Sequence, residues 1–267
     1  MSVDPTLIAA FIALGVVVGF VAGLLGVGGG LIIVPVLIAL FHARGIAPGF
    51  EPQLALGTSL ASILFTAASS VRAHHRHGAV DWTVVRRIAP GIVAGTLGGA
   101  LLAAHVPGRV LTLFFVVFLF YAATQMWLDF KPAAHRVLPG GVQTSLAGGV
   151  IGLVSSWVGI GGGTLSVPYL LWHNVGLHRA IATSAAIGFP IAAAGTVGYV
   201  AGGWNVSGLP AERLGFVYLP ALAGIVAGSV LTAPLGARTA HRLPVRPLKR
   251  IFAVLLYGLA IRMLTSL

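Results

Sequence analysis

Residues 26–37 read GVGGGLIIVPVL and residues 159–170 read GIGGGTLSVPYL, so one pattern, G-[VI]-G-G-G-x-x-x-V-P-x-L, occurs twice at an offset of 133 residues. Further matches follow both copies in the same order: ALGTS at 55–59 with AIATS at 180–184, and IVAGT at 92–96 with IVAGS at 225–229. The chain is therefore interpreted as two copies of one unit. Residues 1–130 form the first repeat, 131–140 an inter-repeat loop and 141–267 the second repeat.

The composition is that of a membrane protein. Of 267 residues, 57% are hydrophobic and only 8% are charged, whereas about a quarter of the residues of a soluble domain are charged. The mean hydropathy of +0.99 extends over the whole length. The net charge of +11 follows from basic loops between apolar runs, which the positive-inside rule explains without nucleic acid. With no cysteine, disulfides and thiolate metal sites are excluded, and we expect no metal and no cofactor.

A helix needs roughly 20 apolar residues to cross a bilayer. Runs without charged residues or histidine that approach or exceed this length are 52–71, 88–104, 110–128, 180–211, 214–237 and 251–261. Two further stretches, 5–41 and 137–172, are too long, because each would make a helix of about 55 Å. Each has a glycine cluster near its middle, where a helix should break. We predict an all-α polytopic fold in which each repeat has a glycine-broken helix hairpin and three transmembrane helices.

The basic residues orient the two repeats. If each broken stretch returns to the side it entered, the loops at 72–87, 129–136, 173–179 and 236–250 share one face with twelve lysines and arginines, and the other face has Arg44, Arg109 and Arg213. This asymmetry predicts inverted repeats within one transmembrane domain, with both termini in the periplasm. Whether the hairpins cross fully or are re-entrant stays open, because their second arms are short.

Inverted repeats with broken helices are typical of secondary transporters, in which free backbone groups line the cargo site. Helices that begin after Gly30 and Gly163 would direct N–H groups at a small anion. The predicted substrate-binding residues are Gly28, Gly29, Gly30, Gly161, Gly162, Gly163, Thr58, Ser59, Thr183, Ser184, Ser155 and Ser156. The residues predicted to shape the breaks are Gly26, Pro35, Gly159 and Pro168. Tight helix packing by glycine, and capping or back-bonding by the hydroxyls, are the alternatives.

The second break is richer in hydroxyls than the first. Ser155, Ser156, Thr164 and Ser166 stand where the first repeat has only apolar residues or glycine, so we expect the cargo to lie toward the second break. All five carboxylates lie outside the apolar runs, which disfavours a cation porter. No Ser-His-Asp order or histidine–carboxylate spacing indicates an enzyme.

The duplicated glycine motifs, with ALGTS and AIATS after them, resemble the TauE/SafE family along essentially the whole chain. The resemblance implies a multi-pass transporter of the bacterial inner membrane that exports sulfite or a small organosulfonate. The residues that carry the resemblance are Gly26–Gly30 with Pro35, and Gly159–Gly163 with Pro168. Ala182 departs from the first repeat, which has Gly57. Uptake of another sulfur-containing or carboxylate anion, and a non-transporting assembly partner in the membrane, are the alternative functions. Transport direction, proton coupling and oligomeric state stay open.

Overall fold

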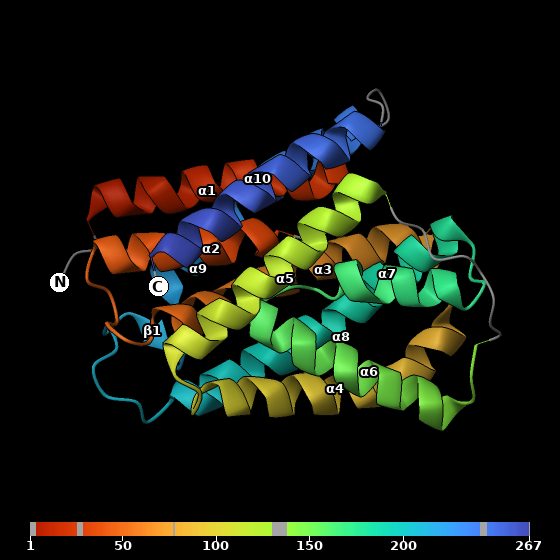
Figure 1. The fold of residues 1–267 in the computed structure, drawn as a ribbon, viewed down its shortest axis with the longest axis horizontal. Coiled ribbons are helices and arrows are strands. Elements are labelled where there is room, and N and C mark those ends of the chain that lie inside the picture. The colour runs from red at the N-terminus through yellow and green to blue at the C-terminus, as the bar shows by residue number, and fades with distance from the viewer. Residues whose placement is uncertain (1–3, 26–28, 77, 130–137, 241–244, 267) are drawn as a thin grey trace.

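The computed structural model describes residues 4–25, 29–76, 78–129, 138–240 and 245–266, and within them it is almost entirely helical (Figure 1). The elements of the first half are α1 (Pro5–Leu25), α2 (Gly30–Ala43), α3 (Glu51–Arg76), α4 (Trp82–Ala103) and α5 (Gly108–Leu128). Those of the second half are α6 (Gly141–Val158), α7 (Gly163–Trp172), α8 (Leu177–Gly203), β1 (Arg213–Leu214), β2 (Val217–Tyr218), α9 (Leu219–Ala240) and α10 (Val245–Thr265). The predicted all-α polytopic fold is confirmed.

Seven of these helices, namely α1, α3, α4, α5, α6, α8 and α9, are long and apolar enough to cross a membrane. The chain is therefore a multi-pass membrane protein. Both overlong stretches are divided as predicted, since α1 ends at Leu25 and α2 begins at Gly30, while α6 ends at Val158 and α7 begins at Gly163. Gly26, predicted to shape the first break, and Gly28, predicted to bind the substrate, lie outside the described residues. Pro35 and Pro168 lie inside α2 and α7.

The hairpin of α1 and α2 returns to the end of the molecule at which it starts. Arg44, just after α2, donates from Nη1 to Asp4 Oδ2 over 2.7 Å, just before α1. Hydrogen bonds from Thr6 and Arg44 lower the pKa of Asp4 to about 2, so this carboxylate is ionised at neutral pH. With 14 residues in α2 and 10 in α7, the return arms are about 21 and 15 Å long, shorter than a bilayer core of about 30 Å.

The helices of the two halves are interleaved. Helix α1 packs against α9, α4 against α6, α3 against α8 and α5 against α10, so each of these four pairs joins one helix of each half. Helix α4 also packs against α8. The recurring IVAG segments lie in the first two interfaces. A methyl group on Gly95 of α4 would be 2.7 Å from the Gly149 carbonyl carbon of α6, and one on Gly228 of α9 would be 2.6 Å from Val16 N of α1. Glycine thus allows close backbone contact at both places.

A short antiparallel hairpin before α9 was not predicted from the sequence. The apolar run 214–237 was expected to be one span, but Leu214 pairs with Val217 and Arg213 with Tyr218, and the helix begins only at Leu219. Gly215 turns this hairpin with a φ of +58°, a left-handed conformation that suits glycine. The hairpin is held on the end of α8, where Phe216 N–H donates to the Tyr199 carbonyl over 3.1 Å.

Candidate functional site

The break between α6 and α7 has a defined glycine geometry. Gly159 ends α6 with a φ of +66° and Gly162 precedes α7 with a φ of +78°. At either position, the left-handed backbone conformation would cost a residue with a side chain roughly 1–2 kcal/mol of conformational free energy. The Gly162 carbonyl accepts hydrogen bonds from the N–H groups of Leu165 and Ser166 at 3.0 and 2.8 Å. The chain therefore turns twice within four residues and begins a new helix.

The broken segment lies between α3 and α8, which together with their neighbours form the centre of the bundle. Ser59 of α3 donates from Oγ to the Gly159 carbonyl over 2.8 Å. On the other side, a methyl group on Gly188 of α8 would be 2.8 Å from the Gly161 carbonyl oxygen. Both contacts fall in the inner part of helices of 26 and 27 residues. If α3 and α8 span the bilayer, the break lies well inside it.

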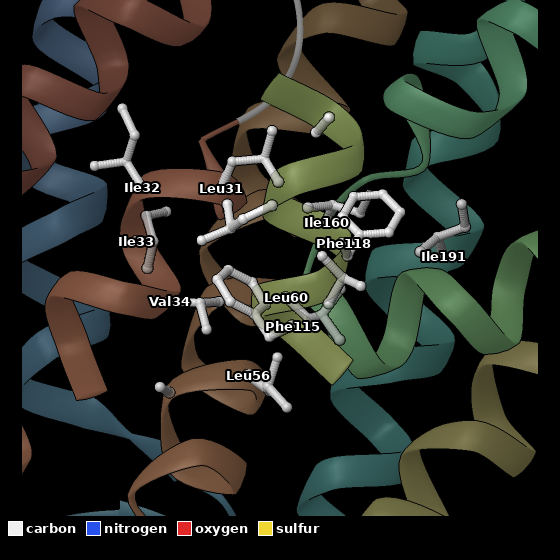
Figure 2. Close-up of a cluster of buried hydrophobic side chains, with 14 of the residues drawn as sticks. Leu31, Ile32, Ile33, Val34, Leu56, Leu60, Phe115, Phe118, Ile160 and Ile191 are labelled. Atoms are coloured by element: carbon white, nitrogen blue, oxygen red, sulfur yellow. The ribbon is translucent and has the colours of Figure 1, made fainter. Parts of the chain in front are cut away.

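The two glycine breaks are in contact with each other. A methyl group on Gly30, the first residue of α2, would collide with the Gly159 carbonyl oxygen and would be 3.1 Å from Ile160 Cγ2. Ile160 belongs to a buried apolar cluster with residues of α2, α3 and α5, among them Leu31 and Phe118 (Figure 2). This cluster fixes one side of the broken segment, because its members are almost fully buried.

The other side of the break presents hydrogen-bond donors that have no acceptor. The hydroxyls of Ser155 and Thr164 are buried and have no hydrogen-bond partner in the described part of the chain. Ser155 Oγ lies 3.7 Å from the point that a methyl group on Gly162 would occupy. Among the described residues, the N–H groups of Gly163 and Thr164 at the start of α7 also have no acceptor. Buried polar groups without partners are uncommon, and here they lie in the first turn of α7 and beside Gly162, close to the positive end of the helix.

A pair of serines holds the start of α7 against α8. Ser166 Oγ donates to the Gly162 carbonyl over 2.8 Å and lies 2.7 Å from Ser184 Oγ. Ser184 therefore lies next to the break, and its hydroxyl bonds another side chain. The sequence marked Thr164 and Ser166 only as part of a hydroxyl-rich region, because their directions depend on where α7 begins.

Three of the predicted hydroxyls are engaged elsewhere. Thr58 Oγ1 accepts from Tyr218 N–H at 2.9 Å, and Thr183 Oγ1 accepts from Asp81 N–H at 3.0 Å. These bonds are reciprocal, because each threonine holds the residue directly before a helix of the other half, α9 or α4. Ser156 Oγ donates to the Leu153 carbonyl over 2.7 Å. The structure thus brings Ser59, Ser155 and Ser184 to the second break, together with the glycines from Gly159 to Gly163 and Gly30.

We expect Thr58→Val to lower stability. The substitution removes the acceptor of the buried Tyr218 N–H, and an unpaired buried donor costs about 1–3 kcal/mol. Thermal unfolding in detergent measures the effect, with Thr58→Ser, which keeps the hydroxyl, as the control. Equal melting temperatures for Thr58→Val and the wild type would show that this bond does not brace the two halves.

Charged side chains are absent from the described surroundings of the break. The buried polar side chains are hydroxyls and Gln53, apart from His173 at the far end of α7, whose Nδ1 lies 2.8 Å from the Tyr169 carbonyl oxygen. The described residues contain no cluster of three or more histidines and carboxylates that could hold a metal ion. Among the described residues, the polar groups at the break are therefore backbone dipoles and hydroxyls, and the apolar side chains of Ile63 and Ile191 lie beside them.

Comparisons with known proteins place these features in context. A sequence profile of the family described as sulfite exporter TauE/SafE matches residues 11–263. A probable membrane transporter protein of Haemophilus influenzae is 36% identical over 259 residues, which cover 97% of this chain and 98% of the relative. The probable membrane transporter protein YunE of Bacillus subtilis is 26% identical over 266 residues, covering 92% and 93% of the two chains. No solved structure matches.

Proposed function

Because the chain belongs to the TauE/SafE family and is a membrane transporter, we propose that it is a secondary transporter of a small anion, which exports sulfite or a small organosulfonate by alternating access. The observation that carries this proposal is the break between α6 and α7. There, the buried hydroxyls of Ser155 and Thr164 lack partners beside the N-terminus of α7. An oxyanion would accept hydrogen bonds from these groups and lie at the positive end of the helix dipole.

The pairing of helices supports alternating access. The pairs α1–α9 and α4–α6 each combine one helix from each half, and we propose that they move as two units against α3 and α8, with α4 sliding along α8, against which it also packs. The breaks meet where Gly30 contacts Gly159, and a relative movement of the two units changes access at that point. We propose that the halves are inverted repeats, as in many transporters with broken helices.

The orientation that we propose places both termini in the periplasm and the protein in the inner membrane. Figure 1 shows the start of α1 and the end of α10 toward the same end of the molecule. The other end has the basic residues Arg72 and Arg76, near the end of α3, and Arg86 and Arg87, near the start of α4. The positive-inside rule assigns that end to the cytoplasm.

Single-cysteine labelling tests this orientation, and the chain has no cysteine of its own. Gly45 and Gly78 form a matched pair, since both are exposed, have φ of +62° and +63°, and have no atom near an added side chain. In intact cells, we expect Gly45→Cys to be labelled by a maleimide that passes the outer membrane and does not cross the inner membrane. It should label Gly78→Cys only after the inner membrane is opened. The reverse pattern would contradict the orientation.

Flux from proteoliposomes tests the function. Purified protein is reconstituted with internal sulfite, ethanesulfonate or lactate, with and without an imposed potential. We expect potential-sensitive flux of sulfite and of ethanesulfonate, because moving one charge through 100 mV is worth about 2.3 kcal/mol. Flux of lactate alone would indicate a carboxylate permease. If none of the anions moves, the protein does not transport them by itself, and a partner role would be favoured.

A further inference from the structure

The donors at the break are all neutral groups. They are the hydroxyls of Ser155 and Thr164, which are 0% and 6% exposed and have no partner among the described residues, and the N–H groups at the start of α7. The helix end contributes the equivalent of roughly half a positive charge. No lysine or arginine is among the buried polar residues that the structure describes.

The charged side chains and histidines on the elements around the break lie toward the helix ends. They are His42 at the end of α2, Glu51, Arg72, His74, His75 and Arg76 on α3, Arg109 on α5, His173 after α7, and His178 and Arg179 on α8, while α6 has none. The tyrosines on these elements are Tyr121 on α5, Tyr169 on α7 and Tyr199 on α8. Arg72 is nine residues from Ile63, which contacts Gly161, and this corresponds to about 13 Å along the helix. The side chains of Arg72 and Arg179 are exposed on the surface of the protein.

A site of this kind distinguishes anions by charge. The cost of transferring an ion from water to a medium of low dielectric constant grows with the square of its charge. The attraction of fixed dipoles for the ion grows only in proportion to the charge. Doubling the charge therefore raises the cost fourfold and the attraction twofold. Without a buried cation to offset the difference, the site accepts a single negative charge better than two.

From this balance we infer, on the basis of the function proposed above, that the break selects monoanions. Sulfite exists near neutral pH as a mixture of a dianion and its protonated form, hydrogen sulfite. The carried form is hydrogen sulfite, which accepts hydrogen bonds from Ser155, Thr164 and the start of α7. Small sulfonates are carried because they have one negative charge at every physiological pH. Sulfate and thiosulfate, which are dianions, bind poorly.

The pH dependence of flux separates the two forms of sulfite. Wild-type proteoliposomes are held at equal internal and external pH under a fixed potassium-diffusion potential, and total sulfite is kept constant. We expect sulfite flux, at subsaturating concentration, to fall roughly fivefold to tenfold between about pH 6 and about pH 8, in step with the protonated fraction. Ethanesulfonate flux serves as the matched control and should change little. Protein-free liposomes correct for leakage of neutral sulfur dioxide.

Each outcome has a separate meaning. Sulfite flux that stays constant or rises with pH, beside steady ethanesulfonate flux, would overturn the selection of monoanions and leave the transport function intact. A parallel fall for both anions would overturn the inference as well, because the pH effect would then belong to the protein. No protein-dependent flux of either anion would instead refute the proposed function.

Competition and charge measurements give a second test. Sulfate and thiosulfate should inhibit ethanesulfonate flux at least about tenfold less strongly than methanesulfonate does, at equal concentration. Current divided by sulfur flux should correspond to one charge for each sulfite at every pH. Inhibition by the dianions as strong as that by methanesulfonate, or two charges for each sulfite, would contradict the inference.

Discussion

Gly162→Leu is expected to abolish anion flux and to leave membrane insertion intact. Gly162 has a φ of +78°, and a side chain there would collide with Ile191 Cδ1 and extend beside Ser155 Oγ. The left-handed backbone alone costs a leucine roughly 1–2 kcal/mol. The larger effect is that the side chain would lie next to the N-terminus of α7, where we place the anion. Flux from proteoliposomes, normalised to the amount of inserted protein, measures the loss.

The control for backbone strain is Gly208→Leu. Gly208 has a φ of +83°, and no atom lies within 4 Å of an added side chain, in the segment that connects α8 to β1. We expect its flux to stay within about twofold of the wild type, as is usual for surface substitutions. Normal flux from Gly162→Leu, or an equal loss in both variants, would refute the assignment of the site to this break.

The double variant Ser155→Ala with Thr164→Val should raise the half-saturation concentration and leave folding unharmed. A hydrogen bond to a charged group contributes about 1.5–3 kcal/mol, which is about tenfold to hundredfold in affinity for each hydroxyl. Neither hydroxyl has a partner in the described structure, so removing them costs no internal hydrogen bond. We therefore expect an unchanged or higher melting temperature together with weaker binding.

A hydroxyl away from the break provides the comparison. Thr196 of α8 donates to the Ala192 carbonyl over 2.7 Å, and Thr196→Val should leave the half-saturation concentration unchanged. An unchanged half-saturation concentration for the double variant as well would show that Ser155 and Thr164 contribute to packing and not to anion binding. A large fall in melting temperature for the double variant would show that the two hydroxyls serve the fold instead.

The helix breaks could be predicted from the sequence because they have local causes. Each apolar stretch is too long for one helix, and glycine is the residue that the left-handed conformations of Gly159 and Gly162 require. The same kind of local signal places α3, α4, α5 and α8 close to the expected runs. The β-hairpin was missed because 214–218 is apolar, and an apolar run of that length does not distinguish a strand from the start of a helix.

The directions of the hydroxyls could not be predicted, because they depend on contacts between the two halves. Ser155 and Ser156 are adjacent on α6 and therefore about 100° apart around its axis, so only Ser155 reaches the break. Thr58 and Thr183 follow the glycine motifs closely in each repeat, but their hydroxyls bind the segments before α9 and α4. Those segments come from the other half, and their proximity is decided by tertiary packing alone.

The position of a bound anion tests the central claim most directly. A crystal structure of the wild-type protein with a bromine-labelled small sulfonate, at a concentration that saturates flux, would locate the ligand by its anomalous signal. We predict one site at the start of α7, with the sulfonate oxygens in hydrogen-bonding distance of Ser155, Thr164 and the Gly163 N–H group. A sulfonate bound only elsewhere, for example in the cleft of Trp127 and Arg250 at the end of α5 and the start of α10, would contradict the account.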